Sequence, residues 1–207
     1  MKKRAVDVDQ LARDVEWAID HRLPVREQIA MLNKLLSHAE QGSVHQGFAK
    51  GKLAELLLEA EPWRAARLAH EQLAVHRDDD RLWAVLGLAH TLLGNLRSAA
   101  RAYREALALS PCCALYAHNL GHLLDAGLDR PGEALGLLKR AFADLAHEPE
   151  VAGSYAHALL RCGRAEEAKR VLTLGLGGDE RAAEALLADW LGRKRAALGP
   201  VAESRNV

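Results

Sequence analysis

The sequence predicts an all-α fold built from antiparallel helical hairpins that repeat along the chain. Apolar residues make up 49% of the 207 residues, and aromatic residues only 4%. This mixture suits packed helices, because small and straight-chain side chains lose little rotamer entropy there, whereas strands favour β-branched and aromatic residues. The second observation is an internal repeat of about 34 residues, the length of a helical hairpin unit.

Three sequence markers recur in one phase. The pair Leu86-Gly87 returns 34 residues later as Leu120-Gly121, and a turn glycine at Gly94 returns 69 residues later at Gly163. Four alanines, each early in an apolar helical segment, are spaced by 34, 35 and 34 residues: Ala65, Ala99, Ala134 and Ala168. The single step of 35 predicts one inserted residue, which we place near Asp129–Gly132.

The residue types at these positions have physical reasons to recur. Gly87 and Gly121 let the two helices of a hairpin approach closely, and the alanines lie at the crossing, where larger side chains would separate them. Gly94 and Gly163 suit the left-handed conformation that ends a helix. Pro111 ends the following helix, because proline cannot continue the hydrogen-bond ladder.

The central unit, 80–111, resembles the tetratricopeptide repeat (TPR) family. It follows the signature W-x2-L-G-x2-Y…A-x3-F…P through these residues: Trp83, Leu86, Gly87, His90, Ala99, Tyr103 and Pro111. His90 replaces the usual Tyr, and Tyr103 the usual Phe. The resemblance implies a TPR-like α-solenoid of antiparallel helical hairpins, whose repeats span 44–178 in four units: 44–79, 80–111, 112–149 and 150–178.

Helices are predicted on both sides of the repeats as caps that close the solenoid core. Residues 1–43 form an N-terminal helical cap of two helices, the second opened by Pro24. Residues 179–198 form a C-terminal capping helix with Asp179 as its N-cap. We expect 199–207 to be a disordered tail.

The charge balance argues against two classes of partner. Lys and Arg together number 28, as do Asp and Glu, so no overall field draws the chain to nucleic acid or to an anionic membrane. Neither a signal peptide nor an apolar run of roughly 18 residues is recognised. We therefore expect a soluble, cytoplasmic protein without membrane insertion.

The remaining motifs argue against catalysis. The sequence contains no GxSxG, P-loop, strand-associated GxGxxG or HExxH motif, so we expect neither an enzyme nor a cofactor. Cys112, Cys113 and Cys162 form no disulfide framework and no zinc-binding pattern. We interpret them as small buried hydrophobic residues.

One polar cluster allows two interpretations. His118, His122 and Asp125 are spaced to share a helix face, and His157 occupies the matching row of the next unit. We favour a polar, protonatable patch in a peptide-binding groove. The alternative is a metal-binding sensor in which the three residues hold a divalent transition metal.

The resemblance also implies a concave groove lined by the first helix of each unit, which binds a peptide or helix of a partner protein. Asn119 matches an asparagine of the carboxylate clamp of TPR co-chaperones, but Ala84, Leu88 and Ser154 depart from that clamp, which argues against capture of a chaperone tail. The groove residues implied are Lys50, Arg81, Ala84, Leu88, Thr91, Leu115, His118, Asn119, His122, Asp125, His157 and Arg161.

The function expected is thus a non-enzymatic protein–protein interaction adaptor or scaffold. The chain's size and N-terminal helices also resemble TPR chaperones of bacterial type III secretion, so a cytoplasmic secretion-type chaperone for an apolar client is an alternative. An end helix that pairs with a second copy would produce a homodimer.

Overall fold

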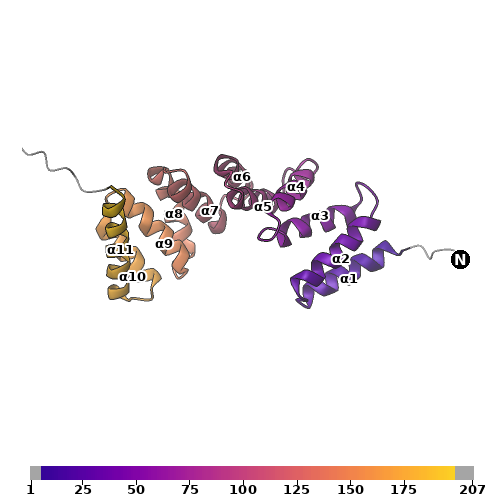
Figure 1. Cartoon of the computed structure of the whole chain (residues 1–207), viewed down its shortest axis with the longest axis horizontal. Coiled ribbons are helices and arrows are strands. Elements are labelled where there is room, and N and C mark those ends of the chain that lie inside the picture. The colour runs from indigo at the N-terminus through magenta and orange to yellow at the C-terminus, as the bar shows by residue number, and fades with distance from the viewer. Residues whose placement is uncertain (1–5, 199–207) are drawn as a thin grey trace, which may run out of the picture. The chain divides into compact units, whose positions relative to one another are not determined.

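The computed structural model describes residues 6–198, with side chains as far as residue 192. The predicted disordered tail, 199–207, lies outside the described residues. Eleven α-helices and one π-helical segment occupy the described part of the chain, and no strand occurs in it (Figure 1). The all-α fold class is therefore confirmed. Two compact units divide the chain at Cys112 and Cys113.

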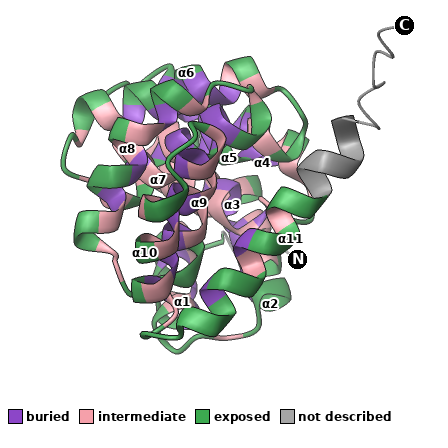
Figure 2. Ribbon diagram, turned by 90° about the vertical axis from the view of Figure 1, so that its left-hand side faces the viewer, coloured by how far each residue is buried: buried purple, intermediate pink, exposed green. Residues whose placement is uncertain are grey.

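The first unit contains three successive helical pairs. Its helices are α1 (Val8–Asp20), α2 (Val25–His38), α3 (Val44–Leu56), α4 (Pro62–Leu73), α5 (Asp80–Leu92) and α6 (Leu96–Leu109). Each helix packs on the next along the chain. Side chains at helical spacing form the core, among them Leu32 and Leu35 of α2 and Leu53 of α3, all fully buried. Figure 2 shows the buried residues on the faces that the helices turn toward one another.

The second unit continues the pairing and ends in a longer helix. Its elements are α7 (Ala114–His122), η1 (Leu123–Gly127), α8 (Pro131–Asp144), α9 (Pro149–Arg161), α10 (Ala165–Gly175) and α11 (Glu180–Leu198). The Asp179 carboxylate accepts a hydrogen bond from the Ala182 amide at 2.9 Å, which satisfies one of the free amides at the start of α11. None of the helices in residues 6–198 combines the length and hydrophobicity needed to span a bilayer.

The two Leu-Gly pairs mark close helix contacts. A Cβ atom at Gly87 would lie 2.8 Å from the Tyr103 ring, and one at Gly121 would lie 2.6 Å from Leu138 Cγ. Both distances are too short for a real Cβ contact. The close approach predicted from these glycines is therefore present in both units.

The inserted residue of the third repeat lies in a helix, which corrects the position near Asp129–Gly132 predicted from the sequence. Three residues separate α5 from α6, and three also separate η1 from α8, so this turn has not lengthened. Gly87 lies five residues before Leu92, the last residue of α5. Gly121 lies six residues before Gly127, the last residue of η1. The extra residue is accommodated by the π-helical turn η1, where each hydrogen bond spans one more residue than in an α-helix.

A single residue replaces the turn glycine in this repeat. Gly94 and Gly163 have φ angles of 73° and 79°, as predicted, and Asp129 takes the equivalent position with a φ of 56°. Aspartate is one of the few residues other than glycine that enter the left-handed region at modest cost. The turn geometry is thus the same in the three repeats although the residue is not.

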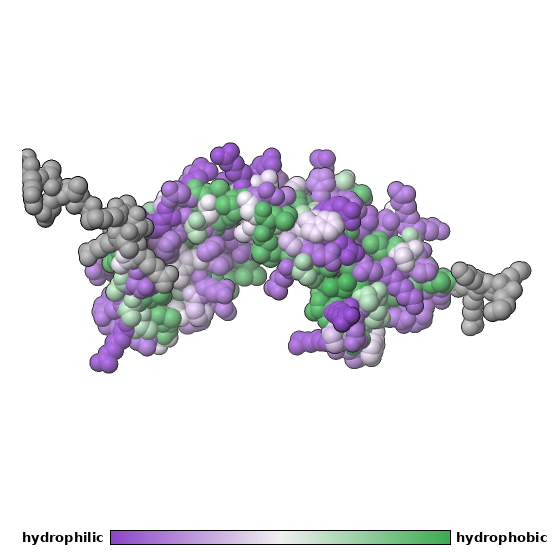
Figure 3. Space-filling view, viewed as in Figure 1, coloured by the Kyte–Doolittle hydropathy of each residue, from purple (hydrophilic) through white to green (hydrophobic). Residues whose placement is uncertain are grey.

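The three cysteines are more exposed than the sequence predicted. Cys112 and Cys162 are exposed and Cys113 is half-buried, all three as free thiols. They lie at turns and at the start of α7, outside the helix faces that form the core, so the prediction that they are buried was wrong. On the face drawn in Figure 3, hydrophilic residues surround smaller hydrophobic patches.

Candidate functional site

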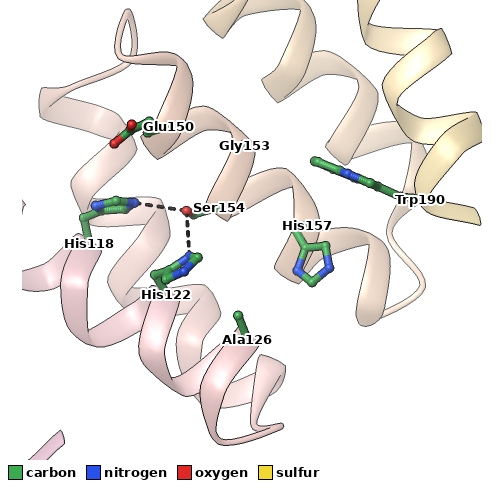
Figure 4. A pocket seen from close by; sticks show the side chains of 8 residues that line it. All are labelled: His118, His122, Ala126, Glu150, Gly153, Ser154, His157 and Trp190. Carbon is green, nitrogen blue, oxygen red and sulfur yellow. Dashed lines mark hydrogen bonds between the residues drawn. The ribbon is translucent and has the colours of Figure 1, made fainter. Parts of the chain in front are cut away.

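The second unit contains a hollow of about 560 Å³ bounded by α7, η1, α9 and α11. Helices α7 and α9 are the first helices of successive hairpins, the ones that line the groove of a TPR protein by resemblance. Figure 4 shows the eight residues that line the hollow: His118, His122, Ala126, Glu150, Gly153, Ser154, His157 and Trp190. Three of the predicted groove residues, all histidines, therefore meet in one place.

Ser154 joins two of these histidines across the hairpins. Its Oγ lies 3.0 Å from His118 Nε2 and 3.1 Å from His122 Nδ1. A hydroxyl has one proton, so it donates to one imidazole and accepts an N–H from the other. Burial lowers the pKa of His118, and the nearby His122 lowers it further, while Glu150 partly offsets both. The neutral form of His118 is thereby favoured near neutral pH.

The third histidine is oriented by a buried carboxylate. Asp125 is only 1% exposed, and its Oδ2 accepts a hydrogen bond from His157 Nδ1 at 2.5 Å. Arg161 donates to Oδ1 of Asp125 at 3.0 Å and to its backbone carbonyl at 2.5 Å. The same guanidinium also donates to Asp129. These bonds satisfy the buried carboxylate and hold the His157 ring at the edge of the hollow.

The predicted face of His118, His122 and Asp125 does not form. The two histidines bond Ser154, whereas Asp125 points toward His157 and Arg161 and is buried. The π-helical turn is the cause, because it adds a residue to the helix between His122 and the end of η1. Among residues 6–192, no three His, Cys, Asp or Glu side chains are arranged to hold a metal ion.

Two lining residues that sequence reasoning missed supply an acid and an aromatic ring. Glu150 is an exposed residue in the first turn of α9, at the position that Leu115 takes one repeat earlier. Trp190 comes from α11, and its ring meets that of His157 edge-to-face at a centroid distance of 5.4 Å. No repeat marker points to Trp190, because α11 follows the last complete unit. Glu150 could have been found from its register with Leu115.

The other predicted groove residues lie elsewhere in their own units. In the second unit Leu115 is 59% exposed and Asn119 is half-buried, and neither lines the hollow. In the first unit Lys50 forms an ion pair with Glu71 at 2.8 Å, and Thr91 donates to the Gly87 carbonyl at 2.9 Å.

The last three predicted groove residues belong to α5, and their surroundings differ. Arg81 lines a separate hollow of about 520 Å³ within the first unit, where Gly51 leaves open space. Ala84 is half-buried and Leu88 is 37% exposed. Neither of these two lines the hollow that Arg81 borders.

Comparison with known proteins identifies the repeat. The tetratricopeptide repeat family model matches residues 123–189. No curated protein matches the chain in sequence at a significant level.

Solved structures agree with the chain in fold at low sequence identity. The MamA 41-end chain from Desulfovibrio magneticus RS-1 is 14% identical, with a TM-score of 0.72, covering 86% of this chain and 98% of its own. A crystal structure of MamA protein is 16% identical, with a TM-score of 0.69 and coverages of 86% and 94%. TTC0263, a thermophilic TPR protein of Thermus thermophilus, is 19% identical, with a TM-score of 0.62 and coverages of 89% and 99%. The family match thus places a tetratricopeptide repeat in residues 123–189, and the shared fold shows that the chain is an all-α solenoid like those of the tetratricopeptide repeat structures.

Proposed function

We propose that the chain is a non-enzymatic adaptor that binds a peptide or helix of a partner protein, with the hollow of the second unit as the anchoring site. The observation that carries this proposal is the hollow itself, placed between the first helices of two successive hairpins. Its lining combines apolar surface with a few polar groups, the composition expected of a binding site.

Gly153 makes the proposal testable, because it keeps the hollow open. A Cβ atom at Gly153 would meet nothing within 4 Å, and its φ angle is not among the positive ones. Gly153→Leu therefore places a bulky side chain in the lining through a Cβ atom that meets no neighbour. Gly136→Leu is the matched control, because Gly136 is also a helical glycine with open space around it but is exposed on α8 and outside the lining.

The experiment is affinity capture from a lysate of the source organism with three versions of the chain, followed by protein identification. We expect Gly153→Leu to lose the partners that the unaltered chain and Gly136→Leu retain, with equal helical circular dichroism in all three. Recovery of the same partners by the Gly153→Leu chain would remove the hollow as the binding site. Charge reversal at Asp125 is a poorer test, because that side chain is buried and would disturb folding.

A further inference from the structure

We propose that the hollow of the second unit selects a basic side chain, a lysine or arginine, from the partner segment. This inference rests on the proposed function and specifies the chemistry of the partner. Four features of the described lining carry it: a carboxylate outside any ion pair, imidazole acceptors, the absence of a lining lysine or arginine, and an indole ring at the far end.

The carboxylate is that of Glu150. It lines the hollow, and no described side chain forms an ion pair with it. Among the described residues it is the one carboxylate in the lining, which includes no lysine or arginine. The nearby cation, Arg161, already bonds both Asp125 and Asp129. An incoming carboxylate would therefore meet Glu150 without a compensating cation, whereas an incoming cation would form a charge-assisted hydrogen bond.

Two of the three histidines add a hydrogen-bond acceptor each, and these acceptors also favour a cationic ligand. Ser154 donates to one of His118 and His122 and accepts an N–H from the other, and only the ring that donates to Ser154 keeps its second nitrogen as a hydrogen-bond acceptor. His157 donates its Nδ1 proton to Asp125, so the neutral ring has its lone pair on Nε2. Ammonium and guanidinium groups have only donors, and they match such a set of acceptors.

The shape of the lining fits the stem of a long basic side chain. Figure 4 shows Glu150 and Trp190 at opposite ends of the hollow, with Gly153 and Ser154 between them. Lysine and arginine pack their methylene stems on apolar surface while the charged head reaches a polar partner. With the charged head at Glu150, the Trp190 ring at the other end of the lining offers apolar surface to the stem. The open space at Gly153 leaves room for the stem.

The test uses a displayed library of random linear peptides, selected on the full unaltered chain. Affinities of the selected peptides are then measured by fluorescence anisotropy for the Glu150→Gln, Glu148→Gln, Gly153→Leu and Gly136→Leu chains. Glu148 is the matched control for Glu150, because it is exposed at the start of the same helix and lies outside the lining.

We expect selected peptides enriched in lysine and arginine. Glu150→Gln should weaken them about tenfold, the factor that corresponds to losing one charge-assisted hydrogen bond. Gly153→Leu should abolish binding, while both control chains should bind as the unaltered chain does. Glu150→Lys should in addition shift selection toward acidic peptides.

Other outcomes separate the two proposals. Peptides that are acidic or purely apolar, yet lost in Gly153→Leu, would overturn the basic preference and leave the anchoring role in place. Peptides that bind the Gly153→Leu chain unchanged would overturn both. Failure to select any peptide would also overturn both, because a site for an exposed partner segment must bind some linear sequence.

Discussion

The side chains of Asp125 and His157 meet at 2.5 Å although they belong to consecutive hairpins and lie 32 residues apart in the chain. Arg161 approaches the same carboxylate from one turn further along α9. A buried acid of η1 thereby connects the first helix of one repeat to the first helix of the next. Because His157 borders the hollow, this contact also determines the position of one of its walls.

Loss of the buried carboxylate should cost more stability than loss of its exposed neighbour. Asp125→Ala leaves Arg161 without its buried partner and removes the acceptor for His157, so we expect a free energy of unfolding about 2 kcal/mol lower. Asp129→Asn is the control, because Asp129 is exposed and its ion pair with Arg161 contributes less than about 1 kcal/mol. Urea unfolding of the full chain measures both. Equal losses would contradict a buried, inter-repeat role for Asp125.

Replacing Asp129, the left-handed turn residue, by glycine should make the chain more stable. Asp129→Gly removes the strain of an L-residue at a φ of 56° but also removes an exposed ion pair. The strain is worth about 1 kcal/mol or more and the ion pair less, so we expect a net stabilisation of about 0.5 kcal/mol. The reverse change at the equivalent turn, Gly163→Ala, should destabilise by about 1 kcal/mol. Thermal unfolding of the two variants should therefore shift in opposite directions.

Two glycines of the second unit should respond oppositely to alanine. At Gly121 the added Cβ meets the buried Leu138 at 2.6 Å, so Gly121→Ala should cost about 1–3 kcal/mol through overpacking. At Gly153 the added atom meets nothing, so Gly153→Ala should stabilise the helix by about 0.5–1 kcal/mol. Chemical unfolding of both variants under one set of conditions measures the two changes in stability. A destabilised Gly153→Ala chain would mean that the hollow is not open.

Acidification should weaken the fold partly through His118. Its pKa is lowered in the folded state, first by burial and then by His122, whereas an unfolded histidine titrates near about 6.5. Between these two values the unfolded chain binds more protons, so the free energy of unfolding falls as the pH falls through that window. His118→Gln should reduce this loss between about pH 7.5 and about pH 5.5, measured by urea unfolding at each pH.

Part of the loss should remain in that variant. The pKa of His90 is also lowered, by burial and then by Arg101 and His70, and it acts in the same direction. The double change His118→Gln with His90→Gln should therefore flatten the profile further. An unchanged pH dependence in the single variant would show that His118 has the same proton affinity in both states.

The hairpins were predictable because close helix packing requires small residues at a fixed spacing. Gly87 and Gly121 lie against Tyr103 and Leu138 as their 34-residue step predicts. The family signature around Trp83 further predicted that successive helices pair as antiparallel hairpins. These features depend on short-range periodicity, which a single sequence displays directly.

The candidate site was predictable only where helical periodicity held. His118, His122 and His157 reach one hollow, but the π-helical turn directs Asp125 into the interior, away from the face that a regular helix predicts. Trp190 reaches the hollow through the packing of α11 on the last hairpin, a long-range relationship that no local pattern encodes. The cysteines were misjudged because residue type alone does not distinguish turn positions from core positions.

The six-residue advance from Gly121 to Gly127 has a consequence for protein engineering. Repeat proteins are often altered by exchanging one unit for an idealised unit of standard length, on the assumption that neighbours interact only through interchangeable surfaces. Here a standard unit would omit one residue and rotate the end of the helix by about 100°. The exchanged chain would keep its hairpins but lose the connection from Asp125 to the next repeat. A functional chimera must therefore preserve the number of residues in this helix, even where their identities change.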